Sequence, residues 1–179
     1  MKARFEESPD IFLTEEDVRS HLFAALLKNG FAVIKTTEDH SSSIELHSEV
    51  RWYGHQAKKR KYRSDIVLID VSQLSTRGAA GYELPSKGYG FERFSGIIET
   101  KLRRRNGESD GALVRRIRAD MTKLSNISSG VSREFVGHVV VFDKKKDVRE
   151  KMPDNHGNIE VTYSFPPQRS RQLEQRLIS

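Results

Sequence analysis

Cysteine is absent from this chain of 179 residues, which excludes disulfide bonds and thiolate metal sites. No apolar run approaches the about 20 residues that a membrane-spanning helix needs. The segment from Met1 to Asp10 is charged and has no apolar centre, so we expect no secretory signal peptide. These absences suit a reducing compartment, and we expect a cytoplasmic protein with no membrane partner.

Familiar catalytic motifs are also missing. The chain has no Gly-x-x-x-x-Gly-Lys phosphate loop and no nucleophile elbow. Its six histidines are scattered, and no pair has the spacing of zinc ligands. The sequence therefore gives no indication of a P-loop nucleotide site, a serine hydrolase site or a histidine zinc site.

Basic residues exceed acidic ones in a chain of ordinary hydrophobicity. Lys and Arg number 31 against 25 Asp and Glu, a net charge of +6, and 36% of the residues are hydrophobic. This length suits one domain over residues 1–179, with a core at about 14–142 and a C-terminal extension at 143–179. A basic domain favours a nucleic-acid partner, although an ordinary basic protein is the alternative.

The pattern of apolar residues predicts helices that alternate with strands. We expect helices at 14–29 and 110–127. We expect strands at 44–53, 66–69, 96–102 and 136–142, an edge strand at 159–165, and a long loop at 72–94. Thr14 should cap the first helix, which should bury Val18, Leu22, Ala25 and Leu26. This order indicates an α/β fold with helices on a mixed central sheet.

Glu99 and Lys101 lie near the end of the predicted strand 96–102. Residues two apart on a strand share a face, about 6.6–7 Å apart, so a carboxylate and an ammonium should project together from a buried sheet. Burying both charges costs several kcal/mol unless something compensates them. A bound cation would compensate the carboxylate and a substrate phosphate the ammonium. The alternative is an ordinary salt bridge at a strand end near solvent.

Asp65 stands directly before the aliphatic run 66–69, although Asp is rare inside strands. One interpretation is that Asp65 lies in a turn or at a strand entry, where its carboxylate bonds nearby backbone amides. If instead the strands of Asp65 and Glu99 are neighbours, their carboxylates can hold a hard cation such as Mg²⁺. The cation would polarise a phosphate and activate a water. Lys101 would position that water or stabilise the developing charge.

The run Arg63-Ser64-Asp65-Ile66-Val67-Leu68-Ile69, followed by Ile97-Ile98-Glu99-Thr100-Lys101, resembles the PD-(D/E)xK nuclease superfamily, which includes restriction endonucleases and Holliday-junction resolvases. The predicted elements between 14 and 142 are similar to that family's α-β-β-β-α-β core. The resemblance implies a restriction-endonuclease-like fold. It also implies that Asp65, Glu99 and the Thr100 backbone carbonyl bind Mg²⁺ or Mn²⁺, and that Lys101 is the catalytic lysine. Ser64 replaces the family's proline, and the long segment between Asp65 and Glu99 leaves the pairing of the two strands open.

Many members of this family add a carboxylate from the first helix or first strand. Glu49, on the polar face of strand 44–53, and Glu15, at the start of the first helix, are the candidates for an additional metal ligand. Each also has an ordinary interpretation, because Glu15 suits the helix dipole and Glu49 suits a solvated strand face.

Basic residues gather beside both predicted catalytic strands, with Trp52, Tyr53 and Tyr62 near the first group. Such clusters suit phosphate contacts and base stacking, although solubility is the alternative. We expect the following residues to contact nucleic acid: Lys58, Lys59, Arg60, Lys61, Arg63, Arg103, Arg104, Arg105 and Lys123. On the second helix, the spacing of Arg116, Asp120 and Lys123 also permits salt bridges among themselves.

The resemblance therefore implies a Mg²⁺-dependent endonuclease that hydrolyses phosphodiester bonds in DNA with a metal-activated water. An inactive nucleic-acid-binding module of the same fold is one alternative. A protein whose Glu99–Lys101 pair is a plain ion pair is another. A homodimer is a candidate assembly, and the edge strand 159–165 is its candidate surface.

Overall fold

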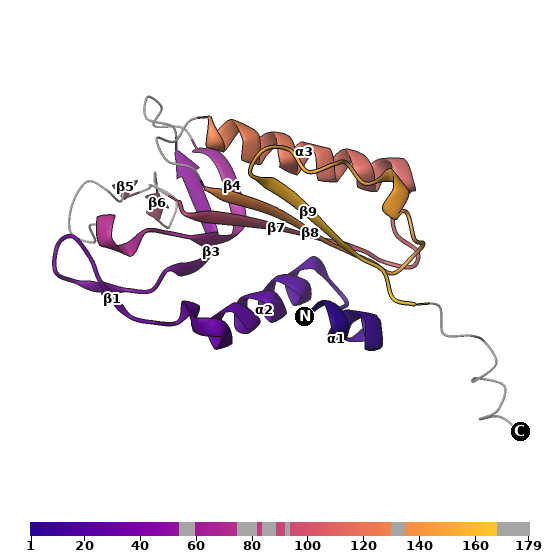
Figure 1. Ribbon diagram of the computed structural model, residues 1–179, viewed down its shortest axis with the longest axis horizontal. Helices are drawn as coiled ribbons and strands as arrows, with labels where there is room; N and C mark the ends of the chain where they lie inside the picture. Colours follow the sequence, from indigo (N-terminus) through magenta and orange to yellow (C-terminus); the bar gives the residue numbers. More distant parts are fainter. Residues whose placement is uncertain (54–59, 75–81, 84–88, 92–93, 130–134, 168–179) are drawn as a thin grey trace, which may run out of the picture.

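The computed structural model describes residues 1–53, 60–74, 82–83, 89–91, 94–129 and 135–167 (Figure 1). Its helices are α1 (Lys2–Glu7), α2 (Glu15–Leu26) and α3 (Asp110–Ser128), with the short turns η1 (Pro9–Ile11), η2 (Leu27–Phe31), η3 (Val71–Gln73) and η4 (Arg149–Lys151). Its strands are β1 (Lys35–Thr36), β2 (Ser42–Ser43), β3 (Leu46–Tyr53), β4 (Arg60–Leu68), β5 (Tyr82–Glu83), β6 (Tyr89–Phe91), β7 (Gly96–Arg103), β8 (Val136–Asp143) and β9 (Ile159–Ser164). The predicted helices and strands are all present, although β4 begins earlier than expected.

Within the described residues, seven strands form one mixed sheet in the order β5-β6-β3-β4-β7-β8-β9, and β1 and β2 pair separately. β3, β4 and β7 are antiparallel neighbours, whereas β7, β8 and β9 run parallel. The parallel step from β7 to β8 requires a crossover, and α3 supplies it. The prediction of an α/β fold with a mixed central sheet flanked by helices is confirmed.

Helices cover both faces of the sheet, with α3 on one side and α1 and α2 on the other (Figure 1). The main core lies on the α3 side and joins that helix to alternate strand residues, among them Val67, Ile97, Val139 and Val141. The smaller core on the opposite side contains Phe5, Phe12, Val18, Leu102 and Phe142. Because side chains alternate along a strand, β7 directs Glu99 and Lys101 to the same side as Ile97, toward α3.

Helix α2 begins as predicted but buries less than predicted. Thr14 and Asp17 form a reciprocal capping box, in which each side chain accepts a bond from the other residue's amide. Of the expected stripe only Val18 is buried, and Leu22, Ala25 and Leu26 are half-buried. The small core on this side gathers around the first turn of α2, so the later turns have less to pack against.

Helix α1 is not predicted by the sequence, because its buried residue Phe5 stands alone among charged neighbours. The Phe5 ring lies 4.7 Å from the ring of Phe142, between centroids, and 5.8 Å from that of Phe12. These contacts attach the first residues of the chain to β8.

The predicted loop 72–94 falls largely outside the described residues. Its described parts include the end of η3 and the strands β5 and β6, and β6 runs parallel to β3. None of the helices in the described ranges combines the length and apolar character that crossing a bilayer demands.

Strand β9 forms one edge of the sheet, as predicted. Its outward N–H groups are partly used within the chain. Ile159 donates to the His156 carbonyl at 3.0 Å, and Val161 donates to Asn155 Oδ1 at 2.9 Å. A second copy would have to break these bonds to add a strand at this half of the edge, so the homodimer stays a prediction without support from this surface.

Arg103, at the end of β7, connects the sheet to the surrounding loops. Its guanidinium donates to Asp143 Oδ1 at 2.9 Å, to Asp110 Oδ1 at 2.7 Å and to the Lys146 carbonyl at 3.0 Å. Tyr163 donates a further bond to Asp143 at 2.8 Å. The prediction that Arg103 contacts nucleic acid is wrong, because its side chain is 0% exposed and bound to carboxylates inside the fold.

Replacing Arg103 by Ala should lower the free energy of unfolding by about 3–5 kcal/mol, because Asp143 would be left as a buried charge without its main partner. Urea unfolding followed by circular dichroism measures this loss. Arg105→Ala is the matched control, since Arg105 pairs with Asp10 while both side chains are exposed, and it should cost less than about 1 kcal/mol. Equal losses in the two variants would contradict the structural role of Arg103.

Candidate active site

Strands β4 and β7 share backbone hydrogen bonds along only part of their length. Their cross-strand pairs end at Ile66 and Ile98. Beyond that point β4 continues beside β3, while β7 continues beside β8. The side of β7 that faces β4 is therefore open from Glu99 onward, and we call this side the open edge.

The Asp65 carboxylate takes the place of the missing backbone partner. Its Oδ2 accepts hydrogen bonds from the Thr100 amide at 2.7 Å and from the Thr100 hydroxyl at 2.8 Å. Further along the open edge, the Leu102 amide lies 3.5 Å from Glu15 Oε1 of α2. Two residues predicted for the site, Asp65 and Glu15, thus line this edge together with the backbone of Thr100.

Glu99 is the most deeply buried carboxylate of the predicted site. The residue is 2% exposed, one oxygen lies 2.6 Å from Lys123 Nζ, and the other, Oε1, has no hydrogen-bond partner. Burial raises the pKa of Glu99 to about 7 against the opposing effect of Lys123, and the negative charges of Asp65 and Asp120 raise it further. Glu99 therefore carries a proton for part of the time at neutral pH.

Lys101 is 8% exposed and lies 2.6 Å from Asp120 Oδ2 on α3. Its ammonium also donates to the Thr100 carbonyl at 3.1 Å. Burial disfavours the charge, but Asp120, with Glu15 and Asp65, outweighs burial and raises the pKa of Lys101 above its ordinary value. Lys101 is therefore an ammonium ion at neutral pH. Glu99 and Lys101 pair with residues of α3 and are buried, which differs from a solvent-exposed salt bridge at a strand end.

Glu49 lies on β3, between the residues that pair with Ser64 and Ile66, and so sits opposite Asp65. Its backbone has a φ of 58°, which is uncommon for a residue with a side chain. Its carboxylate forms ion pairs with Arg19 and Arg63. Arg19 also contacts Asp65 Oδ1 at 3.4 Å. Both predicted auxiliary carboxylates therefore lie near Asp65 or the open edge, and each pairs with an arginine, Glu15 with Arg116.

The predicted nucleic-acid contacts separate into several groups. Lys58 and Lys59 lie outside the described residues, as do the side chains of Arg60 and Lys61. Exposed basic side chains are those of Arg63, Arg104 and Arg105. Lys123 is directed into the site, where its ammonium contacts Glu99 and the Arg63 carbonyl.

Arg19 and the positioning role of Asp120 are the features that sequence reasoning misses. Arg19 stands three residues after Glu16 on α2, a spacing that indicates only a local helical ion pair. Asp120 and Lys123 have the same spacing on α3, and the salt bridge predicted from it is present at 3.7 Å. Both residues also contact charged side chains of β7, because α3 crosses over the sheet between β7 and β8.

The donor atoms at the open edge are those that a hard cation prefers. Asp65, Glu99 and the Thr100 carbonyl offer oxygen ligands, and a buried oxygen of Glu99 has no partner. Among the described residues, no group of three or more His, Asp or Glu side chains is gathered closely enough to hold a metal ion. Two carboxylates and one carbonyl, with waters as the remaining ligands, would suit the chemistry of Mg²⁺. In this structure Lys123 contacts Glu99, Arg19 contacts Asp65, and Lys101 contacts the Thr100 carbonyl.

Comparison of the chain with protein-family models, with curated proteins and with solved structures finds no match. The function has to be inferred from the site itself.

Glu99→Gln should make the stability of the protein less dependent on pH. Between the unfolded-state pKa of 4.5 and the folded-state pKa of about 7, the native protein binds more protons than the unfolded one, so wild-type stability falls as pH rises through this range. The variant should be more stable than wild type at pH 8, by up to about 3 kcal/mol, and similar at pH 5. Thermal unfolding at both pH values tests this, with Glu150→Gln on the exposed turn η4 as control. A stability difference between Glu99→Gln and the wild type that is equal at pH 5 and pH 8 would contradict the burial argument.

Proposed function

We propose that this protein is a metal-dependent endonuclease of the PD-(D/E)xK type, which hydrolyses phosphodiester bonds in DNA at the open edge of β7. One observation carries the proposal. Where β4 and β7 separate, the Asp65 carboxylate bonds the Thr100 backbone, and Glu99 and Lys101 flank Thr100 on the same strand. The order α2, β3, β4, β7, α3, β8 agrees with the core that the sequence resemblance implies. One line of support is local, and the other concerns the whole sheet.

Asp65, Glu99 and the Thr100 carbonyl would hold Mg²⁺ or Mn²⁺. When bound, the cation supplies positive charge that polarises the phosphate and lowers the pKa of a water. The unpartnered Glu99 oxygen is buried, so a cation there would stabilise the carboxylate form of this residue and lower its pKa.

Lys101 acts as an electrostatic partner of the phosphate. Because Asp120 helps to keep it charged, it donates hydrogen bonds to the negative charge that develops on the phosphate. It does not serve as a general base in this protonation state. Asp120 is a positioning residue, since it holds the ammonium beside the Thr100 carbonyl.

Exposed basic residues flank this site and would contact the DNA backbone. Arg63 lies on β4, and Arg104 and Arg105 directly follow the end of β7. Phosphate contacts of this kind bind without regard to sequence. The proposal therefore assigns DNA as the substrate without a preferred sequence.

A catalytically inactive nucleic-acid-binding module is the second candidate. It is favoured by the internal pairing of the charges of the site: Lys101 with Asp120, Lys123 with Glu99, and Arg19 with Asp65. Such a network is compatible with a folded protein that never binds a cation. Turnover separates this candidate from the first.

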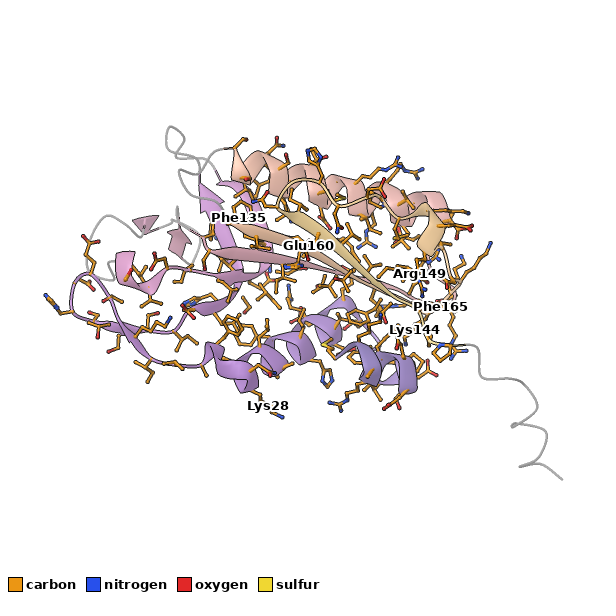
Figure 2. The ribbon with its side chains drawn as sticks, in the orientation of Figure 1. Lys28, Phe135, Lys144, Arg149, Glu160 and Phe165 are labelled. Carbon is orange, nitrogen blue, oxygen red and sulfur yellow. The ribbon has the colours of Figure 1, made fainter. Side chains whose placement is uncertain are left out.

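Lys101→Ala should reduce plasmid nicking by about 10²–10³-fold in Mg²⁺ or Mn²⁺, the effect typical of losing one electrostatic contact to the transition state. Asp65→Asn should abolish it, and EDTA should abolish wild-type cleavage. Lys28→Ala is the control, because Lys28 lies in η2, directly after α2, and projects away from the sheet (Figure 2). Undiminished cleavage by Lys101→Ala would contradict the proposed site. A folded wild-type protein that binds DNA without cleaving plasmid, junction or flap substrates would favour the binding module.

A further inference from the structure

Arg19 of α2 is surrounded by carboxylates from three elements. Its guanidinium contacts Glu16 on its own helix, Glu49 on β3 and, at 3.4 Å, Asp65 Oδ1 on β4. The side chain is only 16% exposed. A guanidinium stays charged at every accessible pH, so it provides a permanent positive charge beside Asp65.

The two oxygens of Asp65 have different partners. Oδ2 is held at 2.7 and 2.8 Å by the Thr100 amide and hydroxyl. Oδ1 has the longer contact of 3.4 Å with Arg19. Oδ1 is therefore the oxygen that can change its partner without breaking the bond between Asp65 and the open edge.

Arg19 would not be released into solvent by such a change. Its ion pairs with Glu16 and Glu49 do not involve Asp65. The guanidinium can lose one carboxylate and keep the other two. A change of partner at Oδ1 is thus a local rearrangement.

We infer that Arg19 is an internal counter-cation of the site: it neutralises Asp65 Oδ1 in the absence of a divalent cation, and the cation has to displace it. This inference rests on the proposed function, because it assumes that Asp65 binds the cation. Two positive charges cannot share Oδ1 without repulsion, so Arg19 lowers the affinity of the site for a divalent cation. It also protects the fold from the repulsion among Glu16, Glu49 and Asp65 when no cation is bound.

Binding of Mn²⁺ measured by electron paramagnetic resonance, with DNA absent, tests the inference without reference to catalysis. Arg19→Met should lower the Kd for Mn²⁺ by about tenfold, which corresponds to about 1.4 kcal/mol. Arg63→Met is the matched control: Arg63 also pairs with Glu49, but its ion pairs do not include Asp65. Its Kd should change by less than about threefold. Arg19→Gln should behave as Arg19→Met does and serves if the methionine variant does not fold.

The outcomes distinguish the inference from the proposal beneath it. Equal Kd values for the Arg19 and Arg63 variants, or weaker binding by the Arg19 variants than by wild type, would overturn the inference and leave the cation site in place. No Mn²⁺ binding by the wild type or by any variant would overturn the cation site and the inference together.

Discussion

Beyond Ile66 and Ile98, strands β4 and β7 no longer share backbone hydrogen bonds, and the Asp65 carboxylate accepts the bond of the Thr100 amide instead. A backbone amide that is buried without a hydrogen-bond partner costs free energy. Because Asp65 accepts the bond of the Thr100 amide, β4 and β7 can separate without that cost. The division leaves one side of β7 without a strand neighbour, and Asp65 and Glu15 lie against it while the β7 residues stay buried. Each residue assigned to the site lies on that edge or makes contact with it through α2 or α3.

The division is stable because the charges that it places in the interior are matched. On the α3 side of β7, Glu99, Lys101 and Arg103 follow one another at alternate positions, and all three are buried. Lys123 of α3 pairs with Glu99, and Asp120 of α3 pairs with Lys101. Asp143 of β8 pairs with Arg103. A strand with these charges on its inner face would otherwise be costly to bury. The same ion pairs set the state of two residues of the candidate site. Lys101 is an ammonium ion beside Asp120, and Glu99 retains one buried oxygen without a hydrogen-bond partner.

The sequence predicts the sheet and its strands well because period-two patterns and apolar runs are local signals. It also predicts Asp65, Glu99 and Lys101 as a group, because charged residues in or beside buried strands require an explanation. What it cannot predict are contacts set by the division of the sheet. Tyr62 and Val67 both pack against the α3-side core, although residues an odd number of positions apart normally face opposite sides of a strand. Strand β4 therefore changes the face that it turns to this core between Tyr62 and Val67, the stretch that contains Asp65 and lies opposite Glu49 with its unusual φ. Arg103 shows the converse error, since a run of three arginines indicates a basic surface while its first member is buried by Asp110 and Asp143.

The most direct test of this account is a crystal structure of the protein soaked in Mn²⁺, with anomalous scattering to locate the ion. The account predicts an anomalous peak at the open edge of β7, with Asp65, Glu99 and the Thr100 carbonyl among its ligands. It also predicts that Arg19 has moved away from Asp65 Oδ1. Mn²⁺ bound only at other surfaces, with Asp65 still in contact with Arg19 and Glu99 still paired with Lys123, would contradict the assignment of this edge as a cation site.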